Sequence, residues 1–174
     1  MAGSRRKSAV AAVLVSLALL ASGCASGSSV DDASGSRAVL YDSIEGLASD
    51  STAIVIGTVT EQRTDGDATI STIEVSNAPW SPGLGSTAPE AELVVVGDLV
   101  DVRQDPASRP LLEVGTEYAL WLTPTMLPDD AASQFFITGS NAGMYVVDGD
   151  IARRGATDTG DDLPDTIAIE GRPS

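Results

Sequence analysis

The sequence of 174 residues contains no histidine, a single cysteine, Cys24, and a single lysine, Lys7. These absences exclude Ser-His-Asp and Cys-His catalysis, histidine-ligated metals, a disulfide within the chain and cysteine zinc sites. Carboxylates are the main groups left for acid–base chemistry, and two Trp, three Tyr and two Phe are few for a sugar-cleaving cleft. We therefore expect a protein that is not an enzyme and has no cofactor, with a hydrolase that uses carboxylates alone as the catalytic alternative.

Positive charge is also scarce, because 10 Lys and Arg face 25 Asp and Glu and give a net charge of −15. Residues 1–23 hold three of the basic residues and no acidic one, so their removal lowers the net charge to −18. A surface this acidic repels phosphate backbones, which excludes nucleic acid as a partner. The lysine-poor composition is typical of a high-GC genome of the actinobacterial kind, and a haloarchaeal source is the open alternative.

The N-terminal segment has the parts of an export signal. Basic residues at positions 5–7 precede a run of 13 mostly apolar residues at positions 9–21. A membrane-spanning helix needs about 20 apolar residues, whereas the apolar part of a signal peptide has about 7–15. The sequence therefore predicts a signal peptide at residues 1–23, with Sec and Tat export both open.

The segment Ala21-Ser22-Gly23-Cys24 follows this run and resembles the lipobox of bacterial lipoproteins. The resemblance implies that the Cys24 thiol receives a diacylglyceryl group and that the chain is cut between Gly23 and Cys24. Two acyl chains anchor a protein stably, since each buried CH₂ contributes roughly 0.8 kcal/mol and one chain binds only marginally. We expect the mature protein at the extracytoplasmic face of the cell membrane, held by lipid on Cys24. An ordinary signal peptide is the alternative.

The rest of the chain is long enough for one domain. Residues 24–36 are small and polar, which predicts a flexible tether. A helix is predicted from Arg37 to Ser49, because apolar residues recur there at helical spacing after a capping Ser36. Residues 155–174 are acidic and predict a flexible, solvated tail, in which Thr166–Ile169 is the one candidate for an edge strand.

Between the helix and the tail the apolar pattern is that of β-strands. Strands are predicted at residues 53–60, 69–76, 93–96, 99–103, 118–122, 134–138 and 144–147. Residues 63–67 are interpreted as a hairpin loop, and Gly57 as a bulge or a close backbone approach. About six short strands after one short helix predict a mainly β domain over residues 37–154. Its fold is a small antiparallel OB-like barrel, closed or nearly closed, and a β-sandwich is the alternative.

Three runs carry a resemblance to known domains. They are Ala53-Ile-Val-Ile-Gly-Thr-Val59, the run from Leu111 to Leu122, and Asn141-Ala-Gly-Met-Tyr-Val-Val-Asp-Gly149. Their apolar rhythm resembles that of uncharacterised exported bacterial domains with a small OB-like or netrin-like barrel. The resemblance covers residues 37–154 and implies a fold but no activity. Netrin-like domains usually contain disulfides, which this chain cannot form within itself.

Acidic residues cluster at three places, each with a possible metal-binding interpretation and a structural one. The pairs Asp65/Asp67 and Asp148/Asp150 flank glycines, and Asp129/Asp130 follows a proline. Calcium prefers such oxygen ligands, but Asp-Gly-Asp is also typical of a tight hairpin turn, and we predict turns and no metal site. Residues 139–143 lack the lysine and the following helix of a phosphate-binding loop and are also predicted to form a turn.

The aromatic residues divide into core candidates and one surface candidate. Trp121, Phe135, Phe136 and Tyr145 lie in apolar strands and are predicted to be core residues. Trp80 lies in a loop rich in proline and glycine, which is too long for an ordinary hairpin. It is the one residue predicted to belong to a binding surface, with closure of the barrel end as its alternative role.

These expectations favour a membrane-anchored, non-catalytic binding or interaction module of the cell envelope, with an envelope protein or a small ligand as partner. An inhibitor or accessory subunit of an envelope enzyme is the alternative, suggested by the netrin-like rhythm. A hydrolase that uses carboxylates alone comes third.

Overall fold

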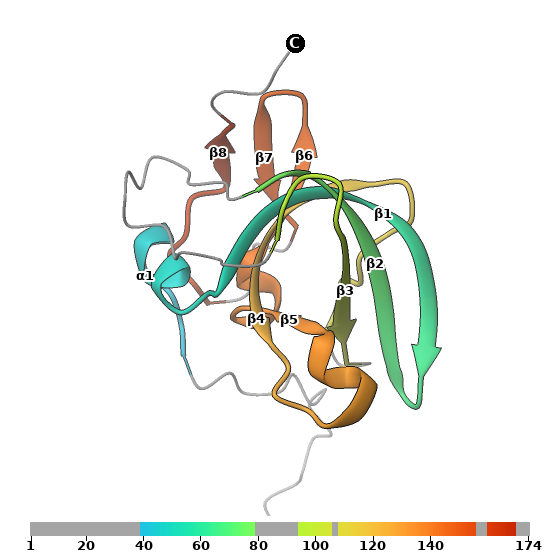
Figure 1. The fold of residues 1–174 in the computed structure, drawn as a ribbon. Helices are drawn as coiled ribbons and strands as arrows, with labels where there is room; N and C mark the ends of the chain where they lie inside the picture. Colours follow the sequence, from blue (N-terminus) through green and yellow to red (C-terminus); the bar gives the residue numbers. More distant parts are fainter. Residues whose placement is uncertain (1–38, 79–93, 106–107, 156–159, 170–174) are drawn as a thin grey trace, which may run out of the picture. The chain divides into compact units, whose positions relative to one another are not determined.

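A closed barrel with a three-stranded extension is the main feature of the computed structural model, which describes residues 39–78, 94–105, 108–155 and 160–169 (Figure 1). The strands in these ranges are β1 (Ala53–Asp65), β2 (Ala68–Asn77), β3 (Leu99–Gln104), β4 (Glu117–Pro124), β5 (Phe135–Ile137), β6 (Met144–Asp148), β7 (Ile151–Arg154) and β8 (Thr166–Ala168). They are accompanied by the helix α1 (Ile44–Ser49) and by two short 3-10 helices, η2 (Asp129–Ser133) and η3 (Ser140–Gly143). The prediction of a mainly β fold with one short α-helix is confirmed.

The barrel contains five strands in the order β1-β2-β3-β5-β4 and closes because β4 also pairs with β1. Strands β6, β7 and β8 extend the sheet beyond β4. The other pairings are antiparallel, but β3 and β5 run parallel and are joined at Val102 and Phe135. The prediction of a small OB-like barrel is therefore confirmed, while the expectation that it is wholly antiparallel is wrong. The reason is that β4 pairs with β1 and not with β3. The connection after β4 then places β5 between β4 and β3, where it runs parallel to β3.

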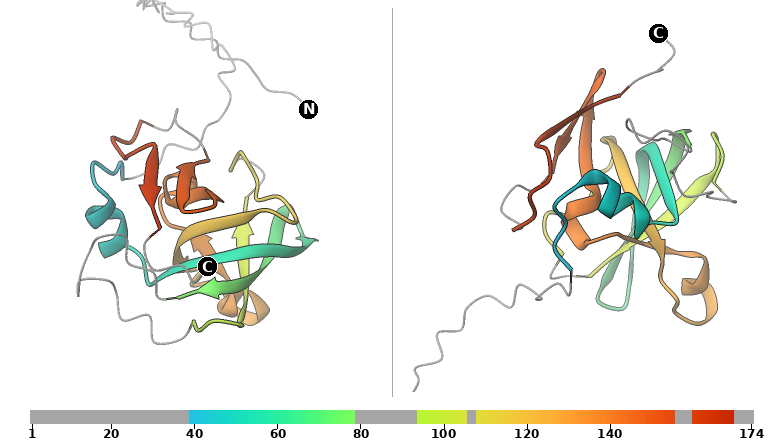
Figure 2. Two further views of the ribbon diagram at one scale, coloured as in Figure 1. Left: turned by 90° about the horizontal axis from the view of Figure 1, so that it is seen from above. Right: turned by 90° about the vertical axis from the view of Figure 1, so that its left-hand side faces the viewer.

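Two hydrophobic cores explain why the first part of β1 and most of β4 are apolar. Val55 of β1 and Leu120 of β4 belong to the core inside the barrel. Ile54 of β1 and Trp121 of β4 belong to a second core, which we call the outer core. Helix α1 and the extension cover it from outside the barrel (Figure 2). Strands buried on both faces need apolar residues at every position, so a continuous apolar run results.

The aromatic core predictions are confirmed for Trp121 and Tyr145, whose side chains are fully buried in the outer core. Their ring centroids lie 5.4 Å apart. Phe135 is partly buried and packs against the core inside the barrel. Phe136 is only partly buried and lines a pocket, so its assignment to the core is not confirmed.

Glycines at the predicted bulge and turns have the conformations that the sequence indicates. A Cβ atom on Gly57 would lie 2.5 Å from the backbone oxygen of Glu74, and the β1–β2 register shifts at this point, which confirms the close approach. Gly66 and Gly149 have φ angles of 61° and 62° in the β1–β2 and β6–β7 turns. Both Asp-Gly-Asp segments therefore form hairpin turns. The loop between β1 and β2 is shorter than the predicted residues 63–67, because β1 continues to Asp65.

The helix is shorter than the sequence predicts, because it begins at Ile44 and not at Arg37. The hydroxyl of Ser43 accepts a hydrogen bond from the backbone N–H of Gly46 and caps the helix there. Leu40 lies within the range predicted as helical, but it precedes the helix and is 60% exposed, whereas Tyr41 is buried. The capping position is therefore Ser43, and the predicted cap at Ser36 lies outside the described residues.

Two further expectations are wrong. Residues 94–96 do not form a strand, and Val95 and Val96 are exposed beside the turn at Gly97, whose φ angle is 93°. Residues 160–169 are not a solvated tail, because Leu163 and Ile169 enter the outer core. The candidate edge strand is confirmed as β8, which pairs with β7.

Candidate functional site

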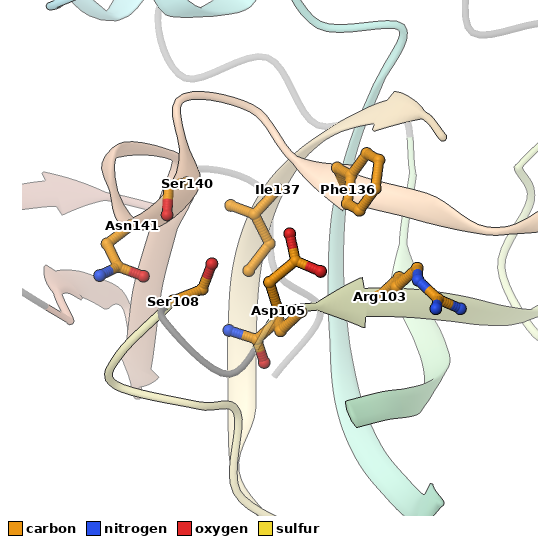
Figure 3. Close-up of a pocket in the computed structure, with 8 residues that line it drawn as sticks. Arg103, Asp105, Ser108, Phe136, Ile137, Ser140 and Asn141 are labelled. Carbon is orange, nitrogen blue, oxygen red and sulfur yellow. The ribbon is translucent and has the colours of Figure 1, made fainter. Parts of the chain in front are cut away.

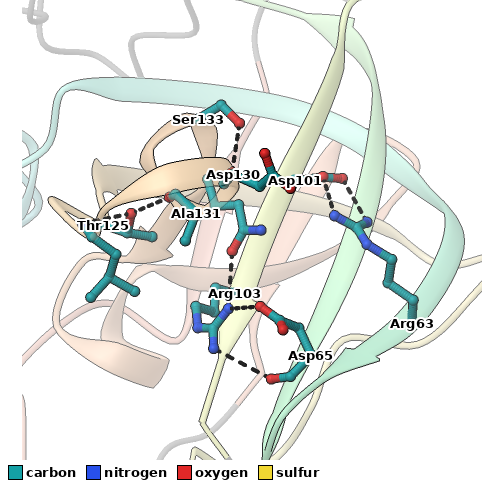
Figure 4. Close-up of polar contacts among 10 residues, drawn as sticks. Arg63, Asp65, Asp101, Arg103, Thr125, Asp130, Ala131 and Ser133 are labelled. Atoms are coloured by element: carbon teal, nitrogen blue, oxygen red, sulfur yellow. Dashed lines mark hydrogen bonds and ion pairs between the residues drawn. The ribbon is translucent and has the colours of Figure 1, made fainter.

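An open cleft of about 420 Å³ lies where the β1–β2 hairpin faces the connection between β4 and β5. Arg63, Thr64 and Asp65 at the end of β1 line one side, and residues 128–131 with Gln134 line the other. We call this feature the hairpin cleft. Figure 4 shows that polar side chains from β1, β3 and the β4–β5 connection meet around it.

The first polar contact beside the cleft joins β1 to β3 across β2. Arg63 donates from Nη2 to Oδ2 of Asp101 at 2.6 Å and from Nη1 to Oδ1 at 3.2 Å, and Thr72 of β2 donates to the same carboxylate at 2.7 Å. The hydrogen bond from Arg63 lowers the pKa of Asp101, and the same bond raises the pKa of Arg63. Both groups thus remain charged over a wider pH range than isolated side chains.

The second contact ties the hairpin turn to the β4–β5 connection. Nη1 of Arg103 donates to Oδ2 of Asp65 at 2.7 Å and to Oε1 of the buried Gln134 at 3.2 Å. Nη2 of the same guanidinium donates to the backbone oxygen of Asp65 at 3.4 Å. One arginine therefore holds both sides of the hairpin cleft at a set separation.

The β4–β5 connection is held by its own hydrogen bonds. Thr125 donates from its backbone N–H to Gln134 O at 3.0 Å and from its hydroxyl to Ala131 O, and the hydroxyl of Ser133 donates to Asp130 O at 3.1 Å. Met126 has a φ angle of 56°, and a left-handed conformation costs a non-glycine residue about 1–3 kcal/mol. The hydrogen bonds hold the connection in one shape, in which the side chain of Met126 is 89% exposed.

The charged side chains at the hairpin cleft give it an acidic balance. Two arginines are outnumbered by four aspartates, so the net charge is −2 at neutral pH; the residues are Arg63, Arg103, Asp65, Asp101, Asp129 and Asp130. Among the described residues, no group of three or more His, Cys, Asp or Glu is placed to hold a metal ion. The calcium alternative thus finds no ligand cluster in this part of the chain. The arrangement is suited to binding a polar or cationic partner.

The structure brings together some of the predicted residues and leaves others aside. Asp65 and the pair Asp129/Asp130 meet at the hairpin cleft, although no local pattern in the sequence indicates that they lie close together. Gly23, Cys24 and Trp80 lie outside the described residues, so lipidation, cleavage and the role of Trp80 stay predictions.

Sequence reasoning missed Arg63, Asp101 and Arg103 as members of a site. The signal available was their position, since Asp101 and Arg103 alternate with the buried Val100 and Val102 on one strand. That alternation indicates an outward-facing charged pair, but it does not reveal the partners on other strands.

No protein-family model matches the chain, and no curated protein is similar to it at a significant level. In the described ranges, no helix is long and apolar enough to cross a bilayer. The function proposed for the chain therefore rests on its residues and their arrangement.

Proposed function

We propose that the chain is an exported lipoprotein, anchored by lipid on Cys24 at the extracytoplasmic face of the membrane. Its barrel is a non-catalytic module that binds a partner protein of the cell envelope beside the hairpin cleft. The basic start, the apolar run and the Ala-Ser-Gly-Cys junction support the anchor. The small, polar residues 25–36 then separate the lipid from the barrel.

The observation that carries the binding role is the exposure of Met126 on an ordered connection. When a partner covers a large apolar side chain that was exposed to water, the complex is stabilised, since burial contributes roughly 25 cal/mol per Å². The hydrogen bonds of Thr125 and Ser133 hold the connection in one shape, so little conformational entropy is lost on docking. Leu127, which is 37% exposed, adds apolar surface next to Met126.

The chemistry of the cleft favours binding over catalysis. A hydrolase that uses carboxylates alone needs one of them protonated near neutral pH. Arg63 instead lowers the pKa of Asp101, so this carboxyl group stays ionised. The chain has no histidine, and its lysine at position 7 belongs to the predicted signal peptide, so neither type supplies a base to the barrel.

Pull-down from envelope extract with the full-length chain tests this function. We expect the variant Met126→Ser, Leu127→Ser to recover less than about a tenth of the partner that the native chain captures, since an interface anchor contributes about 2 kcal/mol or more. Ile151→Ser is the matched control, because Ile151 is 38% exposed and lies in the β7 strand of the extension. Thermal melting shows whether both variants stay folded.

Equal recovery by the native chain and both variants would remove the β4–β5 connection from the interface. Failure of the native chain to capture any protein would contradict the binding role itself. If the captured partner is an enzyme and its activity changes on binding, the chain is an inhibitor or accessory subunit.

A further inference from the structure

A second cavity lies at the seam where β3 and β5 run parallel, and Arg103, which binds Asp65 and Gln134 of the hairpin cleft, also lines it. The two strands are joined at Val102 and Phe135, and beyond this pair lies a pocket of about 230 Å³ (Figure 3). We call it the seam pocket. The lining residues that matter here are Asp105, Ser108, Phe136, Ile137, Ser140 and Asn141.

The polar side of the seam pocket offers oxygen atoms. Figure 3 shows the side chains of Asp105, Ser108, Ser140 and Asn141 gathered around it. Nδ2 of Asn141 donates to the backbone oxygen of Arg109, and this bond sets the orientation of the amide. Oδ1 of Asn141 is buried and has no hydrogen-bond partner within the described part of the chain. A buried acceptor of this kind needs a donor, and a ligand hydroxyl or a water molecule is able to supply one.

The charge of the seam pocket differs from that of the whole chain. Among its described lining residues, Arg103 and Asp105 carry charge and have opposite signs, so this lining is neutral although the chain carries −15. The guanidinium of Arg103 is already bound to Asp65 and Gln134. The described lining therefore offers no free cation for an anionic ligand and no excess negative charge for a cationic one.

The apolar side is formed by Phe136 and Ile137. An aromatic face and an aliphatic side chain pack against C–H groups, while the oxygens opposite them accept hydrogen bonds from hydroxyl groups. The pocket volume lies below the range of about 300–1,000 Å³ that is typical of sites for drug-sized ligands. We propose that the seam pocket binds a neutral, polyhydroxylated ring of the size of one monosaccharide.

Ser140 offers a test in which loss of folding cannot explain loss of binding. Its φ angle is 56°, directly after Gly139 at 62°, so a residue with a side chain adopts a conformation that favours glycine. Ser140→Gly removes the hydroxyl from the seam pocket and relieves this strain. We expect the variant to melt at the same temperature as the native chain or higher, and to bind the ring more weakly.

Saturation-transfer NMR on the full-length chain in nonionic detergent provides the measurement. The probes are glucose, galactose, N-acetylglucosamine and myo-inositol, with glucuronate as the charged comparison. We expect at least one neutral probe to bind with a dissociation constant of about a millimolar, as befits a ligand of this size. Ser140→Gly should weaken it about fivefold, since one hydrogen bond contributes roughly a kilocalorie per mole.

Ser49→Ala is the matched control, because this exposed hydroxyl donates to the carbonyl of Gly46 in α1 and does not line the seam pocket. It should bind the neutral probe as the native chain does. Absence of binding by all four neutral probes would overturn the proposal and leave water as the partner of Asn141. Equal binding by Ser140→Gly, or tighter binding of glucuronate, would also overturn it. None of these results bears on capture of a protein at the hairpin cleft.

Discussion

Arg154→Met is expected to lower the free energy of unfolding by about 3–5 kcal/mol, the usual cost of leaving a buried charge without its partner. Nη2 of Arg154 lies 3.9 Å from Oδ2 of Asp161, and the two side chains are 3% and 0% exposed. Arg154 also donates from Nη1 to the backbone oxygen of Leu163 at 3.1 Å, and Asp161 accepts from the backbone N–H of Tyr41 at 2.8 Å. The pair thus fastens residues 160–169 and the segment before α1 to the extension.

Denaturant unfolding followed by circular dichroism measures this loss. Arg153→Met is the control, since Arg153 is the exposed neighbour of Arg154 in β7 and its replacement should change stability by less than about 0.5 kcal/mol. A loss below about 1 kcal/mol for Arg154→Met would show that the ion pair does not hold the C-terminal segment in place.

Trp121→Ala is expected to cost about 3–5 kcal/mol of stability, as truncation of a large aromatic core residue does. Trp121 is fully buried, packs on Tyr145 and belongs to the core that joins β4 to α1 and the extension. A Cβ atom on Gly143 would lie 3.0 Å from the Cβ of Trp121, so the surroundings are tightly packed. The cavity left by the substitution has therefore little freedom to collapse.

The same unfolding assay, again by circular dichroism, separates packing from simple loss of apolar area. Trp121→Phe keeps an aromatic ring and should cost less than the alanine variant. If both substitutions cost under about 1 kcal/mol, the outer core contributes little and the packing described for β4 is wrong.

The strands and the core were predictable where the signal is local. Ile54, Val55 and Ile56 form an unbroken apolar run, and such a run indicates a strand buried on both faces. The turns at the two Asp-Gly-Asp segments were predicted correctly, because glycine supplies the left-handed φ that a tight hairpin requires.

The features that sequence reasoning missed are non-local. The parallel β3–β5 seam depends on where β4 finds its partner, and local periodicity contains no information on that choice. Residues 160–169 have the acidic composition of a tail, yet Asp161 is buried because Arg154 of β7 meets it. The hairpin cleft likewise needs Asp65, Arg103 and Gln134 from three separate segments. Ser43 was a local signal for the start of the helix. It was missed because the apolar Leu40 suggested that the helix begins earlier.

Membrane fractionation of cells that express Cys24→Ser tests the anchored-lipoprotein claim most directly. The lipobox-like junction predicts that the native chain and the tether control Ser26→Ala occur in the membrane fraction, with a diacylglyceryl group on Cys24 detectable by mass spectrometry of the N-terminal peptide. Cys24→Ser should be released from the membrane or accumulate as uncut precursor. Normal processing and unchanged membrane retention of Cys24→Ser would contradict the proposal that this chain is a lipid-anchored protein.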